Sequence, residues 1–300
     1  MFDEYYRGKS MKILVIGVSS YDTLIYVDNL PTQKEDAALC AKKVAYSIGG
    51  TGAGKALALS VLGAKTSLAT DIGNDEVRDK ILAFLKKEKI DLTILKADRS
   101  TTHTNIMHGN GKRLSFFTSS PQHVEYNPIV RELLASSDAV FLNINDYCRD
   151  YIPIIKKEKK TTIVDIHDYD LGNKYHQEFI DAADILFVSG VNIIEQEKFL
   201  NDYIKGKEIV IITNGDKGSV AIDHNREIYY QKPYIVEDIV DTNGAGDSYS
   251  AGFIFKYLKT KSIEESLKFA SISGALTCSS QDLYNEKATE EYIETLMKNF

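Results

Sequence analysis

Residues 240–248 read Val240-Asp241-Thr242-Asn243-Gly244-Ala245-Gly246-Asp247-Ser248, and no other stretch of the 300-residue chain says as much about its fold and chemistry. Apolar residues recur at helical spacing over residues 249–257, so a helix is expected to begin here. The glycines let the backbone turn tightly and expose its N–H groups at the helix start. Unpaired donors and the positive end of the helix dipole favour a bound anion.

Such an anion site suits phosphoryl transfer, because negative charge accumulates on the transferring oxygens. Asp247 would stand beside the phosphate and could take the proton of an attacking hydroxyl group. The alternative is that Asp247 only caps the helix, since Asp is also favoured at helix starts. Taken alone, the stretch leaves both roles open.

The composition is ordinary for a soluble globular protein, with 43% hydrophobic and 26% charged residues. A formal net charge of −7 argues against broad contact with nucleic acid or an anionic membrane. Cys40, Cys148 and Cys278 lie far apart, as isolated thiols in a reducing compartment do. Residues 1–10 lack the features of a signal peptide and are expected to form a flexible leader. We therefore expect a cytoplasmic protein.

The order of apolar segments predicts an α/β fold in one domain over residues 11–300. Short β-branched runs alternate with helical patterns from residue 48 onward, and three helices are expected after the last strands. This alternation predicts a Rossmann-like, mostly parallel sheet with helices on both faces. The expected strands are 65–69, 139–142, 162–165, 185–188 and 209–213, and the expected helices are 52–63, 75–88, 127–135, 174–183, 192–204, 246–259, 262–279 and 288–299.

Two β-rich segments, 23–47 and 96–119, depart from this alternation. The second contains a hairpin signal at Asn110-Gly111. We expect the two segments to meet as a small β lid over the open end of the main domain, although two unrelated surface hairpins are the alternative. Lid strands could also pair between subunits in a homodimer, unless charges such as those of Lys112 and Arg113 blunt the edge.

Several segments resemble the ribokinase-like (PfkB) carbohydrate kinase family, in the right order and over nearly the whole chain from about residue 12. Residues 241–248, followed by Ala251-Gly252-Phe253, resemble its C-terminal signature. Independent matches in sequence order are far more specific than any one of them. Four other segments resemble the family. Residues 17–22 resemble its first strand, which ends in a substrate-binding Asp, here Asp22, and residues 48–56 with 62–64 resemble its N-terminal signature. Residues 71–75 resemble its glycine–acid turn, and residues 213–218 resemble a turn that borders the nucleotide.

The resemblance implies ATP-dependent phosphorylation of a hydroxyl group of a sugar or sugar-like small molecule. Asp247 would be the general base, and the backbone at Gly244, Ala245 and Gly246 would form the anion hole. The substrate hydroxyls would be held by Asp22, Gly49, Gly50 and Gly54.

By the same resemblance, ATP would lie along the C-terminal half, close to Thr213, Gly215, Gly218 and Asn192. The family's Asn-x-x-Glu pattern falls either on Ser189 and Asn192 or, one turn later, on Asn192 and Glu195. Glu195 would then be near Mg²⁺ or simply an exposed helix carboxylate. Asp241 is the candidate for a monovalent cation, K⁺.

The family usually has Asn where this chain has Gly54, which leaves the sugar open. Lys55 could contact an anionic substrate, but a solvated helix lysine is the favoured interpretation. A nucleoside kinase of the same fold and a catalytically silent sugar-binding regulator are the alternatives. An intact segment from Gly244 to Asp247 argues against the silent regulator.

Three further patterns invite other hypotheses. Residues 49–56 are one residue from a P-loop, but Ala56 lacks the hydroxyl group that binds Mg²⁺. Residues 165–170 are rich in possible ligands, and a solvated acidic loop is favoured for them. His103 and His108, in the expected lid, are predicted to point to solvent or line the pocket rather than bind a metal.

Overall fold

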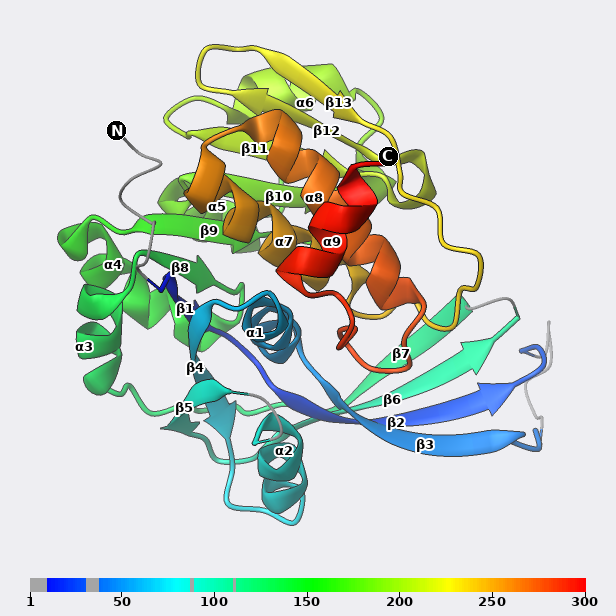
Figure 1. Ribbon diagram of the computed structural model, residues 1–300. Helices are drawn as coiled ribbons and strands as arrows, with labels where there is room; N and C mark the ends of the chain where they lie inside the picture. Colours follow the sequence, from blue (N-terminus) through cyan, green and yellow to red (C-terminus); the bar gives the residue numbers. More distant parts are fainter. Residues whose placement is uncertain (1–9, 31–37, 87–88, 110–111) are drawn as a thin grey trace.

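The computed structural model describes residues 10–30, 38–86, 89–109 and 112–300, and it consists of a large sheet and a small one (Figure 1). In this part of the chain the large sheet has nine strands in the order β13-β12-β11-β10-β9-β8-β1-β4-β5. The strands from β11 to β5 are parallel, β12 is antiparallel to β11, and β13 is antiparallel to β12. Their bounds are β1 (Lys12–Ile16), β4 (Lys65–Ile72), β5 (Ile90–Lys96), β8 (Ala139–Leu142), β9 (Thr161–Asp165), β10 (Ile185–Ser189), β11 (Ile209–Thr213), β12 (Ser219–Asp223) and β13 (Ile228–Gln231).

Helices cover both faces of the large sheet, because its central strands are apolar on both sides. Successive residues of β1, such as Ile13 and Leu14, point to opposite faces of the sheet and belong to two separate buried clusters. The first cluster joins the sheet to α1 (Thr51–Val61), α2 (Arg78–Leu85), α7 (Ala245–Thr260), α8 (Ile263–Cys278) and α9 (Glu290–Met297). The second joins it to α3 (Ile129–Ser136), α4 (Ile152–Glu158), α5 (Gln177–Ala182) and α6 (Gln196–Tyr203). The expected α/β class is confirmed.

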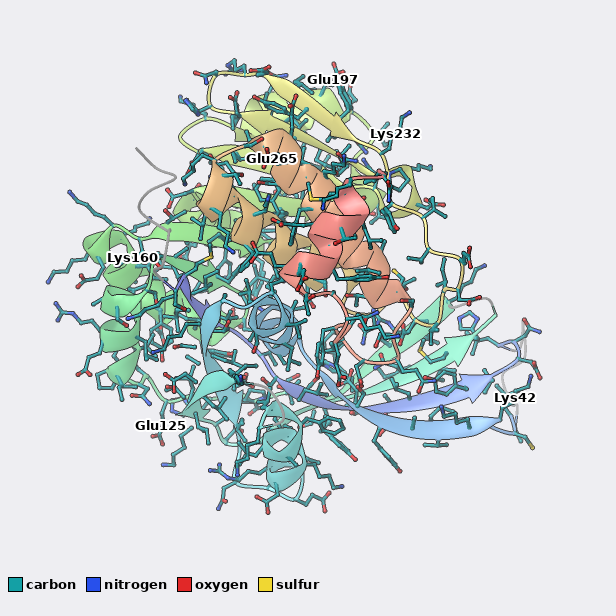
Figure 2. All side chains as sticks on the ribbon, viewed as in Figure 1. Lys42, Glu125, Lys160, Glu197, Lys232 and Glu265 are labelled. Carbon is teal, nitrogen blue, oxygen red and sulfur yellow. The ribbon has the colours of Figure 1, made fainter. Side chains whose placement is uncertain are left out.

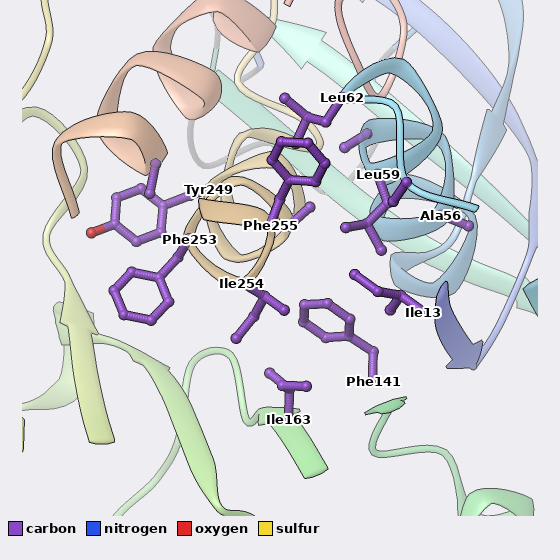
Figure 3. Close-up of a cluster of buried hydrophobic side chains, with 14 of the residues drawn as sticks. Ile13, Ala56, Leu59, Leu62, Phe141, Ile163, Tyr249, Phe253, Ile254 and Phe255 are labelled. Atoms are coloured by element: carbon purple, nitrogen blue, oxygen red, sulfur yellow. The ribbon is translucent and has the colours of Figure 1, made fainter. Parts of the chain in front are cut away.

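Helix α7 occupies the centre of the first cluster (Figure 3). Its Phe253, Ile254 and Phe255 are buried, and Figure 3 shows Phe255 towards Leu59 of α1 and Ile254 towards Phe141 and Ile163 of the strands. Phe253 meets Phe187 of β10 edge to face, with the ring centroids 5.6 Å apart. The helix that begins at the glycine-rich stretch is therefore held by the sheet and by α1 at once. None of the helices in the described part of the chain combines the length and apolar character needed to cross a membrane.

The small sheet is built from the two segments that depart from the alternation. Its strands are β2 (Ser20–Val27), β3 (Lys43–Gly49), β6 (Thr101–His108) and β7 (Lys112–Ser119), in the order β3-β2-β6-β7. β6 and β7 pair antiparallel as the hairpin signal predicts, while Asn110 and Gly111 themselves lie outside the described residues, as does the leader up to residue 9. In Figure 1 this sheet extends away from the large sheet, beside α1 and below α7 and α9.

One expectation about the small sheet is wrong. Asp22 does not end the first strand, because β1 stops at Ile16 and Asp22 lies inside β2. The chain passes from β1 into β2 over residues 17–19 without an intervening helix, so the two strands read as one in the sequence.

The packing of α7 predicts a stability difference between two isoleucines. Ile254 is 0% exposed, whereas Ile194 is 96% exposed. Ile254→Ala should lower the free energy of unfolding by about 2–5 kcal/mol, because it removes buried methyl groups and leaves a cavity. Ile194→Ala, the matched control, should change it by less than about 0.5 kcal/mol. Urea unfolding of both variants checks this, and equal losses would contradict the central position of α7.

Candidate active site

A cavity of about 710 Å³ lies between the small sheet and the carboxyl edge of the large one. The small sheet contributes Asp22, Thr101, His103, Asn105, Arg113, Ser115 and Phe117 to its lining. The main domain contributes Gly50, Thr51, Asn145, Tyr147, His167, Asn243 and Asp247, among others. Open α/β sheets bind ligands at the carboxyl ends of their strands, so this is the expected place for a site.

Helix α7 presents its N-terminus to the cavity. Gly244 is the N-cap with φ of 77°, and a Cβ atom there would lie 2.1 Å from the carbonyl oxygen of Leu283. Only glycine fits this turn without strain. Asp247 is the third residue of α7 and not its N-cap, and among the described residues no side chain caps the N-terminus of α7. The helix-cap alternative for Asp247 is therefore wrong.

The Asp247 carboxylate is instead paired with Lys55. The Lys55 Nζ lies 2.5 Å from Asp247 Oδ1 and 3.3 Å from Asp165 Oδ2, and the lysine is 1% exposed. The expectation of a solvated lysine is wrong, because α1 packs against both the sheet and α7, and position 55 faces both carboxylates. By contrast, Figure 2 shows the labelled Lys160 and Lys232 at the periphery of the molecule.

The interpretation of residues 165–170 as a solvated acidic loop is wrong for its first member. Asp165 is buried because it is the last residue of β9, while Asp168 and Asp170 are exposed as expected. Asp165 Oδ1 accepts a hydrogen bond of 3.0 Å from the backbone N–H of His167, whose ring lines the cavity.

Burial and charge act against each other in this cluster. Burial lowers the pKa of the Lys55 ammonium, but the charges of Asp247 and Asp165 outweigh it and hold that pKa above its ordinary value. Burial raises the pKa of Asp247, and Lys55 counters part of that effect. For Asp165 burial also raises the pKa, but His167 and Lys55 prevail and the pKa lies below its ordinary value.

Asp22 sits across the cavity in a second polar cluster. Its Oδ1 accepts from Ser20 Oγ at 2.6 Å and lies 3.1 Å from His103 Nδ1, and its Oδ2 accepts from Asn105 Nδ2 at 3.0 Å. A Cβ atom at Gly49 would lie 2.3 Å from the Asp22 carboxylate, so this glycine is required by the close approach. Asp22 is thus oriented before any ligand arrives.

Gly50 and Gly54 also stand at close approaches. Gly50 has φ of 91°, and a Cβ atom there would lie 2.4 Å from the carbonyl oxygen of Val18. A Cβ atom at Gly54 would lie 2.6 Å from Asp247 Oδ2. The structure thus brings the expected substrate residues, Asp22, Gly49, Gly50 and Gly54, together with Asp247.

Some cavity residues, among them Thr101, Asn105 and Tyr147, were not predicted to be part of the site. Thr101, His103 and Asn105 alternate along β6 and all line the cavity, so strand periodicity was a usable signal for them. His103 lines the pocket, one of its two expected positions, and packs against the 77% exposed Phe117 with ring centroids 4.6 Å apart. Tyr147 follows β8 by a few residues, and its sequence surroundings give no such signal.

Tyr147 and Thr101 are tied to a buried carboxyl group. Asp71, near the end of β4, accepts from Tyr147 OH at 2.9 Å through Oδ1 and from Thr101 Oγ1 at 3.1 Å through Oδ2. Burial raises the pKa of Asp71 from its ordinary 3.8 to about 7, although both hydrogen bonds lower it. Asp71 therefore supports the cavity wall and titrates near neutral pH.

The expected nucleotide residues lie at the end of β11 or in the turns that follow β10 and β11, and they do not line the cavity. Thr213 ends β11, Gly215 has φ of 56°, and a Cβ atom at Gly218 would lie 2.0 Å from the carbonyl oxygen of Gln231. Asn192 is exposed and donates to Asp170 Oδ1 at 3.2 Å. Like Asp165, these residues lie at or just after the carboxyl ends of parallel strands, so they share one edge of the sheet with the cavity.

The candidate metal residues are single carboxylates. Glu195 precedes α6 and has its Oε2 3.5 Å from Lys198 Nζ. Asp241 is buried, its Oδ1 accepts from the backbone N–H of Asn243 at 2.8 Å, and burial raises its pKa. Over the residues that the structure describes, no three His, Cys, Asp or Glu side chains gather as a metal-binding group. A metal ion at either residue would need its other ligands from backbone or side-chain oxygens, a bound molecule or water.

Known proteins match both the sequence and the fold. The pfkB family of carbohydrate kinases matches residues 10–290. An acarbose 7(IV)-phosphotransferase from Actinoplanes sp. is 27% identical over 286 residues, which cover 89% of this chain and 91% of that protein. A nucleoside kinase from Methanothermobacter thermautotrophicus is 26% identical over 280 residues and 86% of each chain. The solved structure of a microbiome-derived acarbose kinase has the same fold, with a TM-score of 0.86, 24% identity, and coverage of 97% of this chain and 99% of that one.

The titration of Asp71 predicts a pH dependence of stability. Because its folded-state pKa of about 7 exceeds the ordinary 3.8, its contribution is fully present below the lower value and is lost as the pH rises through the higher one. The wild type should lose stability between about pH 5 and about pH 8, and Asp71→Asn should lose less over the same interval. Urea unfolding of both proteins at the two pH values measures the difference, and parallel losses would contradict the raised pKa.

Proposed function

The chain belongs to the pfkB family of carbohydrate kinases, and we propose that it transfers the γ-phosphoryl group of ATP to a hydroxyl group of a sugar or sugar-like molecule bound in the cavity. The observation that carries the proposal is the position of Asp247. Its carboxylate stands in the first turn of α7 and lines the cavity opposite Asp22. A proton acceptor and an anion-binding helix end therefore meet at one point.

The reaction would proceed by in-line displacement. Asp247 takes the proton of the acceptor hydroxyl group while the hydroxyl oxygen attacks the γ-phosphorus. The bond between the γ-phosphorus and the bridging oxygen to the β-phosphate breaks, and ADP leaves. The raised pKa of Asp247, caused by its burial, makes the carboxylate a stronger base. Backbone N–H groups at Gly244, Ala245 and Gly246 would stabilise the charge on the transferring oxygens.

The substrate would lie under the small sheet, with its hydroxyl groups near Asp22, Gly49, Gly50 and Gly54. Asp22, Asn105 and Ser115 supply hydrogen-bonding groups suited to a polyol. A cavity of about 710 Å³ is of the size that holds drug-sized molecules and therefore admits more than a single small sugar. The named relatives, a kinase of acarbose and a nucleoside kinase, support an oligosaccharide-like acceptor first and a nucleoside second.

ATP would lie over the ends of β10 and β11, near Thr213, Gly215, Gly218 and Asn192, with its γ-phosphate at α7. Mg²⁺ would accompany it, held by phosphate oxygens and water with Glu195 as the candidate carboxylate, and would supply neutralisation of the phosphate charge. Asp241, just before the anion hole, is the candidate for K⁺. The protein would act in the cytoplasm.

A homodimer through the small sheet remains a prediction. Leu114 and Phe116 of β7 are exposed, and they alternate with the cavity-lining Arg113, Ser115 and Phe117. They therefore lie on the face of the sheet away from the cavity, where a second copy could cover them.

The first test of this function replaces the base. Asp247→Asn retains an oxygen that can accept from Lys55 but cannot take a proton, so the rate of transfer should fall by about 10²–10⁴. Phosphoryl transfer from Mg-ATP to a panel of sugars, oligosaccharides and nucleosides measures it, with ATP binding followed by calorimetry. Turnover near the wild-type rate would refute Asp247 as the base, and a wild type that phosphorylates nothing while binding a sugar would favour the silent regulator.

The second test addresses the acceptor. Asp22→Ala should raise the KM for the acceptor by about ten- to a hundredfold, because a hydrogen bond to a charged group is lost, and should leave the KM for ATP nearly unchanged. Asp28→Ala is the control, since Asp28 directly follows β2 but pairs with Lys42 outside the cavity. The melting temperature of each variant separates lost folding from lost binding. An unchanged acceptor KM in Asp22→Ala removes Asp22 from the site.

A further inference from the structure

Lys55 is a buried cation whose place in the site the proposed reaction leaves unexplained. It lies on α1, one residue after Gly54, and its ammonium group is enclosed between Asp247 of α7 and Asp165 of β9. Removing an ammonium ion from water is expensive unless close partners compensate it. Partners at 2.5 and 3.3 Å provide that compensation, so the lysine and the two carboxylates form one electrostatic unit.

The two oxygens of Asp247 have different surroundings. Oδ1 accepts the hydrogen bond from Lys55, whereas Oδ2 lies over Gly54, where a Cβ atom would come within 2.6 Å. The absence of a side chain at Gly54 thus makes room for Oδ2. Because Asp247 lines the cavity and Lys55 does not, Oδ2 is the oxygen left to receive a proton.

We propose that Lys55 is a positioning residue that keeps Asp247 ionised and orients it, with Asp165 as the anchor that holds Lys55 in place. This inference rests on the proposed role of Asp247 as general base. Lys55 acts through Asp247 and touches neither the acceptor nor ATP.

The proposal predicts opposite effects of the two neighbours on the base. The positive charge of Lys55 favours the ionised form of Asp247, and the negative charge of Asp165 disfavours it. His167 also favours the ionised form, and it lies beside Asp165 with its Nδ1 3.5 Å from Asp165 Oδ1. The other charged or titratable groups that line the cavity are Asp22, His103, Arg113, Asp146, Tyr147 and Tyr175.

The experiment compares Lys55→Met, Asp165→Asn and the double variant with the wild type. The pKa of Asp247 should rank in the order Asp165→Asn, wild type, double variant, Lys55→Met, from lowest to highest. Lys55→Met should raise it by about 1–3 units, because an opposite charge at contact distance is lost. If Lys55 only filled space, its replacement would lower the melting temperature without producing this order of pKa values. Lys96→Met is the control, since Lys96 forms an exposed pair with Glu125.

Two readouts are used. The acid limb of the pH profile of kcat/KM reports the base in the free enzyme. Carbon-13 NMR of aspartate carboxyl groups, with the Asp247 signal assigned by its loss in Asp247→Asn, reports the same titration without turnover. Failure of the wild type to phosphorylate any acceptor would sink the proposed function while the NMR titration still tests Lys55. An Asp247 pKa that stays within about half a unit in Lys55→Met, or falls, would overturn the inference.

Discussion

The start of α1 is pressed so closely against its neighbours that side chains are excluded from three alternate positions. Cβ atoms at Gly50, Gly52 and Gly54 would lie within 2.4–2.6 Å of Val18, Gly17 and Asp247, respectively. This contact joins the link between the two sheets, the first turn of α1 and the first turn of α7. Everything else in the site depends on it, because it sets the separation between the acceptor side of the cavity and the helix end that would bind phosphate.

Close packing at this point also creates the electrostatics of the site. Once α1 lies against α7, the residue after Gly54 has no route to solvent, and a lysine there must find its partners inside. Asp247 and Asp165 provide them from two other elements. The packing of α1 against α7 therefore determines the pairing of Lys55, and through it the ionisation of Asp247 and Asp165.

The sequence was most informative where chemistry depends on contiguous residues. The glycine-rich stretch before α7 predicted the start of the helix within one residue, and the α/β class followed from the alternation of strands and helices. The burial of Lys55 was missed because its partners lie 110 and 192 residues away, and a helical lysine is usually solvated. β5, β12 and β13 lie outside the expected strands. β5 and β13 are the edge strands of the large sheet, where burial on both faces no longer imposes a continuous apolar run, whereas β12 is buried but has only three apolar residues, Val220, Ala221 and Ile222.

The insertion of the small sheet has a consequence for how such a protein can diverge. Its strands are inserted in the sequence between β1 and α1 and between β5 and α3, and neither insertion interrupts α7 or β9. Thr101, His103 and Asn105 face the cavity from a strand whose register is fixed by β2 on one side and β7 on the other. Substitutions at these alternate positions would change the cavity wall without replacing Lys55, Asp247 or Asp165. The fold therefore separates the residues that would select the acceptor from the helix end that would bind the phosphate, so one could be altered while the other is kept.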